Sequence, residues 1–320
     1  MTGTKEIDPL SIIDAQLVEL AMSAPRLELA DQLVPMVRKI LEGLELPLPA
    51  PAPQSVERLV AIEPSGRQVR ILLFDPAPGL DNKPAVVFFH GGGMVTGRAD
   101  DFPQIPQLIA RDGQCLVISV DYPLAPETPF PGALEDNLAL LEWLGHNAAE
   151  LGINPNKIAV AGQSAGGGHA ASLAIAARDR GLASISYLLL FEPMLDDRTG
   201  SERHLPKHLG YFGWSAESNV YGWSALLGAA AGSSSVPDTA VPARTSNLSG
   251  LPPTCILVGA ADLFAEECLE FSRRLILAGV RVELYMAPGV FHGSSVLAPS
   301  ADISVWTRNV WQDAIRRWLK

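Results

Sequence analysis

The stretch "VAGQSAGGGHAASLA", residues 160–174, places one serine between two glycines, where an apolar run gives way to a helical pattern. Ser164 has Gly162 two residues before it and Gly166 two residues after it, which is the pattern G-x-S-x-G. A sharp turn between a buried strand and a helix exposes a hydroxyl for chemistry, and glycines let the strand and the helix pass close to each other. We therefore predict that Ser164 is a nucleophile.

A serine hydroxyl needs a general base near neutral pH. The chain has six histidines, and only His292 lies beyond residue 208. It sits in "APGVFHGSS", a loop with glycines that directly follows a predicted strand. His169 is five residues along the predicted helix from Ser164, so we expect it to be a helix-packing residue. His292 is the predicted base.

The base in turn needs a carboxylate that fixes its tautomer and stabilises its cation. Asp262 directly follows the apolar run "TCILVGAA" and is the predicted partner, with Asp196 and Asp197 as rivals after the preceding strand. Glu266 and Glu267 are expected on the solvated face of the next helix. The resulting order along the chain, nucleophile, acid and then base, is the one expected for an α/β-hydrolase.

A tetrahedral intermediate also needs hydrogen-bond donors for its oxyanion. "FFHGGGMVTG", residues 88–97, ends a predicted strand at His90, which we expect to shape the loop by hydrogen bonding. The predicted donors are the backbone N–H groups of Gly91, Gly92, Gly93 and Ala165. A phosphate-binding loop is the alternative, but no lysine follows in Walker spacing and no GxGxxG is present.

From residue 57 onward, short apolar runs alternate with helical patterns, which predicts a mostly parallel α/β sheet with eight strands. Runs such as "AVVFFH" are apolar on both faces, as in strands covered by helices on both sides. The predicted strands are 57–63, 69–74, 84–89, 115–121, 157–161, 185–191, 254–259 and 280–286, of which the first two are close enough in sequence to form a hairpin at the sheet edge. The predicted helices are 104–112, 133–150, 165–180, 264–278 and 302–319.

Two segments stand outside this alternation. Residues 9–46 have apolar positions at helical spacing, and a proline-rich linker at 46–54 ends them. The second segment, residues 198–240, is rich in aromatic residues, which favours an ordered lid over a disordered loop. The predicted division is an N-terminal helical cap element with its linker at 1–54, a catalytic domain at 55–197 and 241–320, and a cap insertion at 198–240. Within the insertion, the candidates for a substrate pocket are Tyr211, Phe212, Trp214 and Tyr221, with the cap's own core as the alternative role.

Composition excludes several classes of partner. A formal net charge of −11 argues against nucleic acid and against stable association with an anionic membrane. The N-terminus has no uninterrupted apolar core typical of a signal peptide, and no apolar run approaches the length of a membrane span. Three cysteines without CxxC spacing argue against a disulfide framework. We predict a cytoplasmic protein.

Together, five motifs resemble the hormone-sensitive-lipase-like family of serine esterases, the bacterial family IV of the α/β-hydrolase superfamily. The motifs cover roughly residues 84–320 and are "HGGG" at 90–93, "DYPLAPETPFPGALED" at 121–136, "GQSAGG" at 162–167, "ADLFAEE" at 261–267 and "FHG" at 291–293. The resemblance implies an α/β-hydrolase sheet with a helical cap and the roles already given to Ser164, Asp262 and His292. The chain departs from the family pattern at Gln163, Pro123 and Ala265, and the first of these stands where an acidic residue is usual.

The resemblance implies hydrolysis of carboxylic esters with short to medium acyl chains, without a metal or an organic cofactor. An amidase or a lactonase could use the same groups, and a non-catalytic ligand-binding relative is a further alternative. The predicted partner is a small-molecule ester. Members of the family often form homodimers through the last strand and helix, and "VWTRNVWQDAIRRWL" at 305–319 carries three tryptophans. That helix packing only on its own sheet is the alternative.

Overall fold

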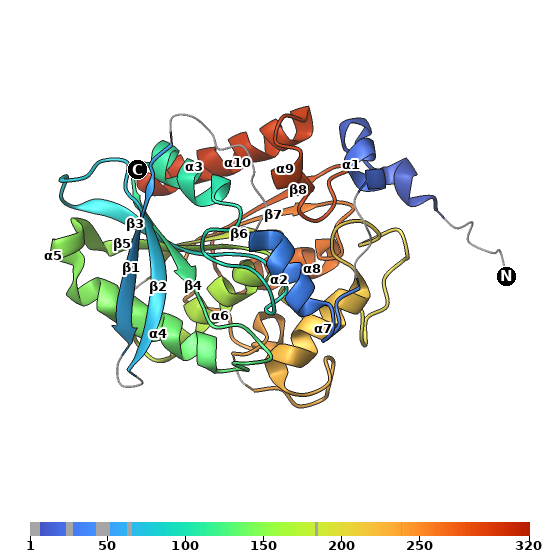
Figure 1. The fold of residues 1–320 in the computed structure, drawn as a ribbon, viewed down its shortest axis with the longest axis horizontal. Coiled ribbons are helices and arrows are strands. Elements are labelled where there is room, and N and C mark those ends of the chain that lie inside the picture. The colour runs from blue at the N-terminus through green and yellow to red at the C-terminus, as the bar shows by residue number, and fades with distance from the viewer. Residues whose placement is uncertain (1–6, 24–27, 43–51, 63–65, 183–184, 238) are drawn as a thin grey trace.

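The computed structural model describes the chain except for residues 1–6, 24–27, 43–51, 63–65, 183–184 and 238. Its centre is an eight-stranded sheet in the order β1-β2-β4-β3-β5-β6-β7-β8 (Figure 1). The strands are β1 (Ser55–Ile62), β2 (Arg67–Phe74), β3 (Lys83–Phe89), β4 (Leu116–Asp121), β5 (Ile153–Gln163), β6 (Ile185–Phe191), β7 (Thr254–Gly259) and β8 (Val282–Ala287). β2 pairs antiparallel with β1 and β4, and all other pairs are parallel. The predicted fold class and edge hairpin are confirmed.

Helices cover both faces of the sheet (Figure 1). The longer ones are α3 (Gln104–Gly113), α4 (Gly132–His146), α6 (Ala165–Asp179), α7 (Ala216–Leu227), α8 (Ala265–Leu277) and α10 (Asp302–Leu319). The shorter ones are α1 (Val18–Ser23), α2 (Val34–Glu42), α5 (Ala148–Leu151), α9 (Ser294–Leu297) and the 3-10 turns η1 (Pro9–Ile12), η2 (Ala15–Leu17) and η3 (Pro242–Arg244). The structure splits the predicted helix 133–150 at Asn147 and adds α9, a single turn too short to give a periodic signal.

Side-chain alternation along the strands builds one core on each face. In β3, Val87 and Phe89 belong to the core that includes side chains of α4, α6 and α8, whereas Val86 and Phe88 belong to the core that includes side chains of α3 and α10. Both sets are buried. Because both faces are covered, the strand is apolar at nearly every position, as its sequence predicts.

The N-terminal segment corrects a prediction. Residues 9–46 do not form one helix, because η1, η2, α1 and α2 are separate and residues 28–33 between the two α-helices are not helical. The physical reason is that the apolar residues serve two different cores: Leu17 packs with Val290 and Phe291, whereas Leu29 belongs to the core under α6. The predicted linker at 46–54 lies largely outside the described residues.

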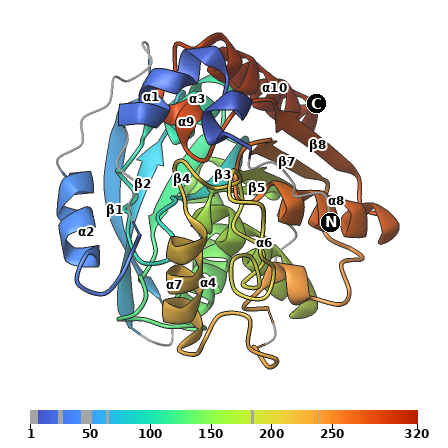
Figure 2. The same cartoon turned by 90° about the vertical axis from the view of Figure 1, so that its right-hand side faces the viewer.

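The segment 8–17 is fastened to the far end of the chain. The N–H of Asp14 donates to the carbonyl of Gly289 at 3.1 Å, in the loop between β8 and α9. Gln16 exchanges two hydrogen bonds with Asp302 at the start of α10. Figure 2 shows α1 lying close to α9 and α10 at one end of the molecule. The first residues therefore support the loop that follows β8.

In its described residues, the insertion 198–240 contains one α-helix, α7, whose N-cap Ser215 accepts from the N–H of Ser218. The insertion lies against the strand ends that carry the proposed site, since a Cβ on Gly213 would meet the carbonyl of His292 at 2.3 Å, and one on Gly222 would meet the carbonyl of Gly93 at 2.3 Å. The catalytic-domain boundaries stay a prediction, although β1 begins at Ser55. None of the helices in the described part of the chain has the length and apolar character to span a membrane.

Candidate active site

The nucleophile candidate sits on a strained turn between β5 and α6. Ser164 has φ 55° and ψ −120°, a conformation that side chains seldom adopt and that such turns use to present the hydroxyl. A Cβ on Gly162 would lie 2.1 Å from the carbonyl oxygen of Gly166, and one on Gly166 would lie 2.1 Å from that of Phe89. The two glycines flanking the serine are therefore required by close backbone approach.

Ser164, His292 and Asp262 form one chain of hydrogen bonds. The Oγ of Ser164 donates to Nε2 of His292 at 2.9 Å, and Nδ1 of His292 donates to Oδ2 of Asp262 at 2.8 Å. The other carboxylate oxygen of Asp262 accepts the N–H of Phe264 at 2.9 Å, which fixes the orientation of the fully buried carboxylate. The structure thus brings together the three residues that the sequence predicts as nucleophile, base and acid.

A second carboxylate, which sequence reasoning missed, lies beside the histidine. Glu192 directly follows β6, and its Oε2 is 3.6 Å from Nδ1 of His292 while accepting the N–H of Gly293 at 2.9 Å. Its Oε1 accepts a hydrogen bond from Nε2 of Gln163 at 3.0 Å. The signal in the sequence that could have identified Glu192 is its position as the single acidic residue at the end of the apolar run "SYLLLFE". Gln163, where an acidic residue is usual, is therefore the neutral partner of this carboxylate.

The surroundings of His292 favour its cation. Burial lowers the pKa of His292, but the carboxylates of Asp262 and Glu192 outweigh burial and raise it to about 9. Burial in turn raises the pKa of Glu192 above its ordinary value, although the nearby His292 opposes this. The arrangement stabilises an imidazolium that forms when the serine proton is transferred.

The glycine loop that carries predicted oxyanion donors passes beside the serine. A Cβ on Gly91 would lie 3.3 Å from the Cβ of Ser164, so the glycine loop runs directly past the nucleophile. Within the described residues, no other backbone group accepts from the N–H of Gly92, Gly93 or Ala165. Ala165 is the first residue of α6, whose N-terminus carries a partial positive charge. These N–H groups are available to an anionic oxygen.

His90 shapes this loop. Its Nδ1 donates to the carbonyl of Gly91 at 2.7 Å, its ring stacks on Tyr122 at 4.2 Å, and Tyr122 donates to the carbonyl of His90 at 2.8 Å. Burial lowers the pKa of His90 to about 4, which keeps the ring neutral. His169 is buried in α6 against Tyr122, and burial lowers its pKa to about 3. The contacts of both rings agree with the expectation that His90 shapes the loop and that His169 packs beside its helix.

The rival carboxylates are engaged elsewhere. Asp196 accepts from Arg198 and Arg203, at 2.8 and 2.9 Å, and Asp197 forms a two-pronged pair with Arg244 at 2.7 and 2.8 Å. Neither is hydrogen bonded to His292 in the described structure. They hold the start of the insertion in place.

Glu267 corrects a prediction. It is only 2% exposed, and its carboxylate accepts from the N–H of Leu195 and from the hydroxyl of Thr199, whereas Glu266 is exposed as expected. The segment after β6 turns its N–H groups inward, and those groups need an acceptor from α8. Burial raises the pKa of Glu267 well above its usual value.

Of the four aromatic pocket candidates, Trp214 lies at the site. Its ring is 6.4 Å from that of His292 between centroids, and a Cβ on Gly93 would lie 2.1 Å from its Cη2. Its indole N–H donates to Oδ1 of Asn219 at 3.3 Å. Trp214 therefore spans from the base to the oxyanion loop.

The other three lie farther out. Phe212 packs on Phe291 at 5.6 Å between ring centroids, in the small core beside the histidine loop. The hydroxyl of Tyr221 donates to Asp31 at 2.8 Å, which joins α7 to the N-terminal segment. Tyr211 is 41% exposed and packs edge-on against Phe212. Tyr221 thus joins the two cap elements, whereas Phe212 packs against the catalytic domain and Tyr211 is exposed, and the place of these three in a substrate pocket stays a prediction.

Among the described residues, one group of His, Cys, Asp and Glu side chains could hold a metal ion, and it consists of Glu192, Asp262 and His292. The group coincides with the hydrogen-bonded site. The atoms of this group that could bind a metal already take part in hydrogen bonds, because Nδ1 of His292 donates to Asp262 at 2.8 Å.

Comparisons with known proteins agree with this geometry. Residues 86–295 match the model of a family described as "alpha/beta hydrolase fold". The chain is 35% identical over 234 residues to Carboxylesterase NlhH of Mycobacterium tuberculosis, covering 70% of each chain. It is 30% identical over 247 residues to Ethyl acetate hydrolase of Pseudomonas putida, covering 76% of each. The solved structure titled "Bacterial Heroin Esterase" superposes with a TM-score of 0.86 at 31% identity, covering 98% of this chain and 100% of that one.

The family match spans more than half of the chain. The relatives and the solved structure are named as esterases or ester hydrolases, and each match covers most of both chains. The chain belongs to the α/β-hydrolase family, within its hormone-sensitive-lipase-like group of ester hydrolases.

Proposed function

We propose that this chain hydrolyses carboxylic esters of short- to medium-chain acids through an acyl-enzyme on Ser164. The observation that carries the proposal is the relay of two hydrogen bonds, 2.9 Å from Ser164 to His292 and 2.8 Å from His292 to Asp262. Beside it lie N–H groups of the glycine loop that have no backbone acceptor in the described part of the chain. Ethyl acetate hydrolase, named for an ester of a two-carbon acid, supports the short acyl chain.

The reaction begins with proton transfer. His292 Nε2 takes the proton of the Ser164 hydroxyl as Oγ forms a bond to the ester carbonyl carbon. The carbonyl oxygen gains a negative charge and accepts from the N–H groups of Gly92, Gly93 and Ala165. Backbone donors of this kind are held by the fold, so they do not have to reorganise as the charge develops.

Collapse of this intermediate breaks the carbon–oxygen bond to the alcohol, and Nε2–H of His292 supplies the alcohol's proton. Water then attacks the acyl-enzyme, His292 takes a proton from it, and the proton returns to Oγ as the acid leaves. Asp262 stays ionised throughout, and Glu192 adds a second negative charge beside the imidazolium. The two carboxylates make His292 a stronger base than a histidine paired with only one.

The test is the initial rate of hydrolysis of p-nitrophenyl esters from acetate to laurate, measured for the wild type and for Ser164→Ala. We expect the highest kcat/KM for the esters from acetate to hexanoate. In Ser164→Ala the rate should fall about 10⁴-fold or more. Ser272→Ala serves as the matched control, because Ser272 is a buried serine on α8, outside the site, and its loss should leave the rate unchanged.

Other outcomes point to the alternatives. No turnover of any ester by the wild type, together with cleavage of an amide or a lactone that Ser164→Ala lacks, would replace ester hydrolysis by those reactions. Equal turnover by the wild type and Ser164→Ala would remove Ser164 as the nucleophile. A wild type that neither turns over any of these substrates nor reacts with a fluorophosphonate would leave the ligand-binding role.

A further inference from the structure

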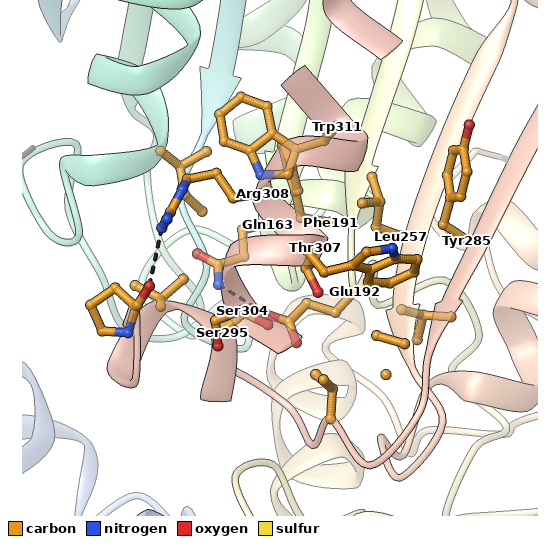
Figure 3. A pocket seen from close by; sticks show the side chains of 18 of the residues that line it. Gln163, Phe191, Glu192, Leu257, Tyr285, Ser295, Ser304, Thr307, Arg308 and Trp311 are labelled. Atoms are coloured by element: carbon orange, nitrogen blue, oxygen red, sulfur yellow. Dashed lines mark hydrogen bonds between the residues drawn. The ribbon is translucent and has the colours of Figure 1, made fainter. Parts of the chain in front are cut away.

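A cavity of about 90 Å³ is lined in part by Gln163 and Glu192 and lies between the sheet and the helices α3 and α10 (Figure 3). Phe191 and Trp311 contribute aromatic walls, and Trp306, which is 42% exposed, stands at its rim. Ser164, Asp262 and His292 are not among its lining residues. The cavity is therefore separate from the space where an ester reaches the nucleophile.

Polar atoms in this cavity lack partners. Ser304 is only 2% exposed and lines the cavity, and within the described structure its Oγ makes no hydrogen bond. The Oε1 of Gln104, also in the lining, is buried and has no hydrogen-bond partner among the residues that the structure describes. A buried polar group left unpaired destabilises the folded state, so such groups call for a ligand or water. Figure 3 shows Ser304 in the same lining as Glu192.

The charged groups of the cavity, in contrast, already make hydrogen bonds. Glu192 accepts from Gln163 and Gly293, and the guanidinium of Arg308 donates to the carbonyl of Pro299 at 3.2 Å. Because the lining holds one acidic and one basic side chain, neither an anion nor a cation is favoured, and either would lose its hydration on entering. The unpaired groups, a hydroxyl and an amide oxygen, match a neutral ligand that both donates and accepts a hydrogen bond.

Size and wall chemistry narrow the class further. An apolar cavity of about 150 Å³ holds benzene, so on the same scale about 90 Å³ holds roughly four non-hydrogen atoms. The walls are mainly hydrocarbon and aromatic, as in sites that bind small apolar ligands and orient them with a few polar groups. We propose that this cavity binds a short aliphatic alcohol, whose hydroxyl is held by Ser304 and whose chain packs on Trp311.

Such a ligand would lie against Glu192, the carboxylate whose Oε2 accepts the N–H of Gly293 and lies 3.6 Å from Nδ1 of His292. The cavity is thus two contacts away from the base. Its connection with the reaction rests on the proposed function, because ester hydrolysis releases an alcohol. The binding itself does not depend on that function, and it can be measured without substrate.

The experiment is a titration of the substrate-free protein with 1-propanol, followed by intrinsic tryptophan fluorescence, because Trp306 and Trp311 line the cavity. We expect a saturable change for the wild type. Ser304→Ala removes the hydroxyl and should raise the Kd about 3- to 10-fold, the effect of one hydrogen bond. Ser304→Leu fills the cavity and should abolish saturation.

The matched control is Ser272→Ala, since Ser272 is equally buried, its Oγ is also unpartnered in the described structure, and it lies in α8 on the other face of the sheet. It should bind 1-propanol with the wild-type Kd. A fluorescence change that stays linear with 1-propanol, or saturation with the same Kd in Ser304→Ala and the wild type, would overturn the proposal. Saturable binding that Ser304→Ala weakens, in a protein that hydrolyses no ester, would support the cavity and refute only the proposed function.

Discussion

Glu192→Gln should lower the pKa at which the proposed base becomes active. The carboxylate oxygen of Glu192 lies 3.6 Å from Nδ1 of His292, and both side chains are about nine-tenths buried. The substitution can keep the hydrogen bonds: the new amide oxygen accepts from Gly293, and the new amide group donates to Gln163 once that side chain turns its own amide over. The change therefore removes a charge and leaves the shape.

The expected size follows from Coulomb's law. Two unit charges 3.6 Å apart, at an effective dielectric constant of about 20, interact by about 4–5 kcal/mol, or roughly 3 pKa units. This is an upper limit, because burial raises the pKa of Glu192 itself and its charge is shared with two hydrogen bonds. With the pKa of His292 raised to about 9 in the wild type, we expect a fall of at least about one unit in the variant.

The measurement is kcat/KM for p-nitrophenyl butyrate against pH, with spontaneous hydrolysis subtracted. Neutral His292 is the active form, so the wild-type rate should rise with pH toward about 9. In Glu192→Gln this acidic limb should move to lower pH. Glu266→Gln removes the same charge from a side chain that is 53% exposed and should shift the limb by less than about 0.3 unit. A limb at the same pH in Glu192→Gln and the wild type would refute the electrostatic role of Glu192.

Three further predictions concern the oxyanion loop and two buried carboxylates. Gly93→Ala places a Cβ 2.1 Å from Trp214 at a φ of +62°, and the displaced donor should lower kcat/KM about 10²–10³-fold; a wild-type rate in a protein with an unchanged circular dichroism spectrum would contradict this. Arg244→Met leaves the fully buried Asp197 without its cation and should lower the free energy of unfolding in urea by about 3 kcal/mol, whereas a loss below about 1 kcal/mol would show that the pair adds little. Glu267 has a pKa raised above 4.5 by burial, so it keeps its proton in the folded state where the unfolded chain loses it, and its contribution to stability falls as pH rises above about 4.5. Glu267→Gln should therefore flatten the decline of unfolding free energy between pH 5 and 8, and an unchanged slope would argue against a buried acid.

Much of the site could be predicted because its determinants are local. Ser164 directly follows β5, Asp262 and His292 lie in the loops after β7 and β8, and the carboxyl ends of parallel strands meet at one edge of the sheet. The glycines around the serine are recognisable for the same reason, since close backbone approach admits no side chain there. Placing the strands was enough to bring these residues together.

What could not be predicted depends on contacts between distant segments. Glu267 has the helical position of a solvated residue, and only the return of the chain at 195–199 buries it. Glu192 was missed because its role exists only once β5 and the loop after β8 lie on either side of it. The N-terminal residues 9–46 show helical spacing, but spacing does not tell whether one core or two receive the apolar side chains.

The bond from Asp14 to Gly289 joins two segments that are far apart in the chain, and it supports the loop that carries His292. Ser164, in contrast, lies between β5 and α6, whose side chains are buried in the central core. A contact between a peripheral segment and a loop opens at a lower free energy than the core of a sheet. Opening of the N-terminal segment therefore displaces the base while the serine and the glycine loop stay in place, so activity is lost before the fold is.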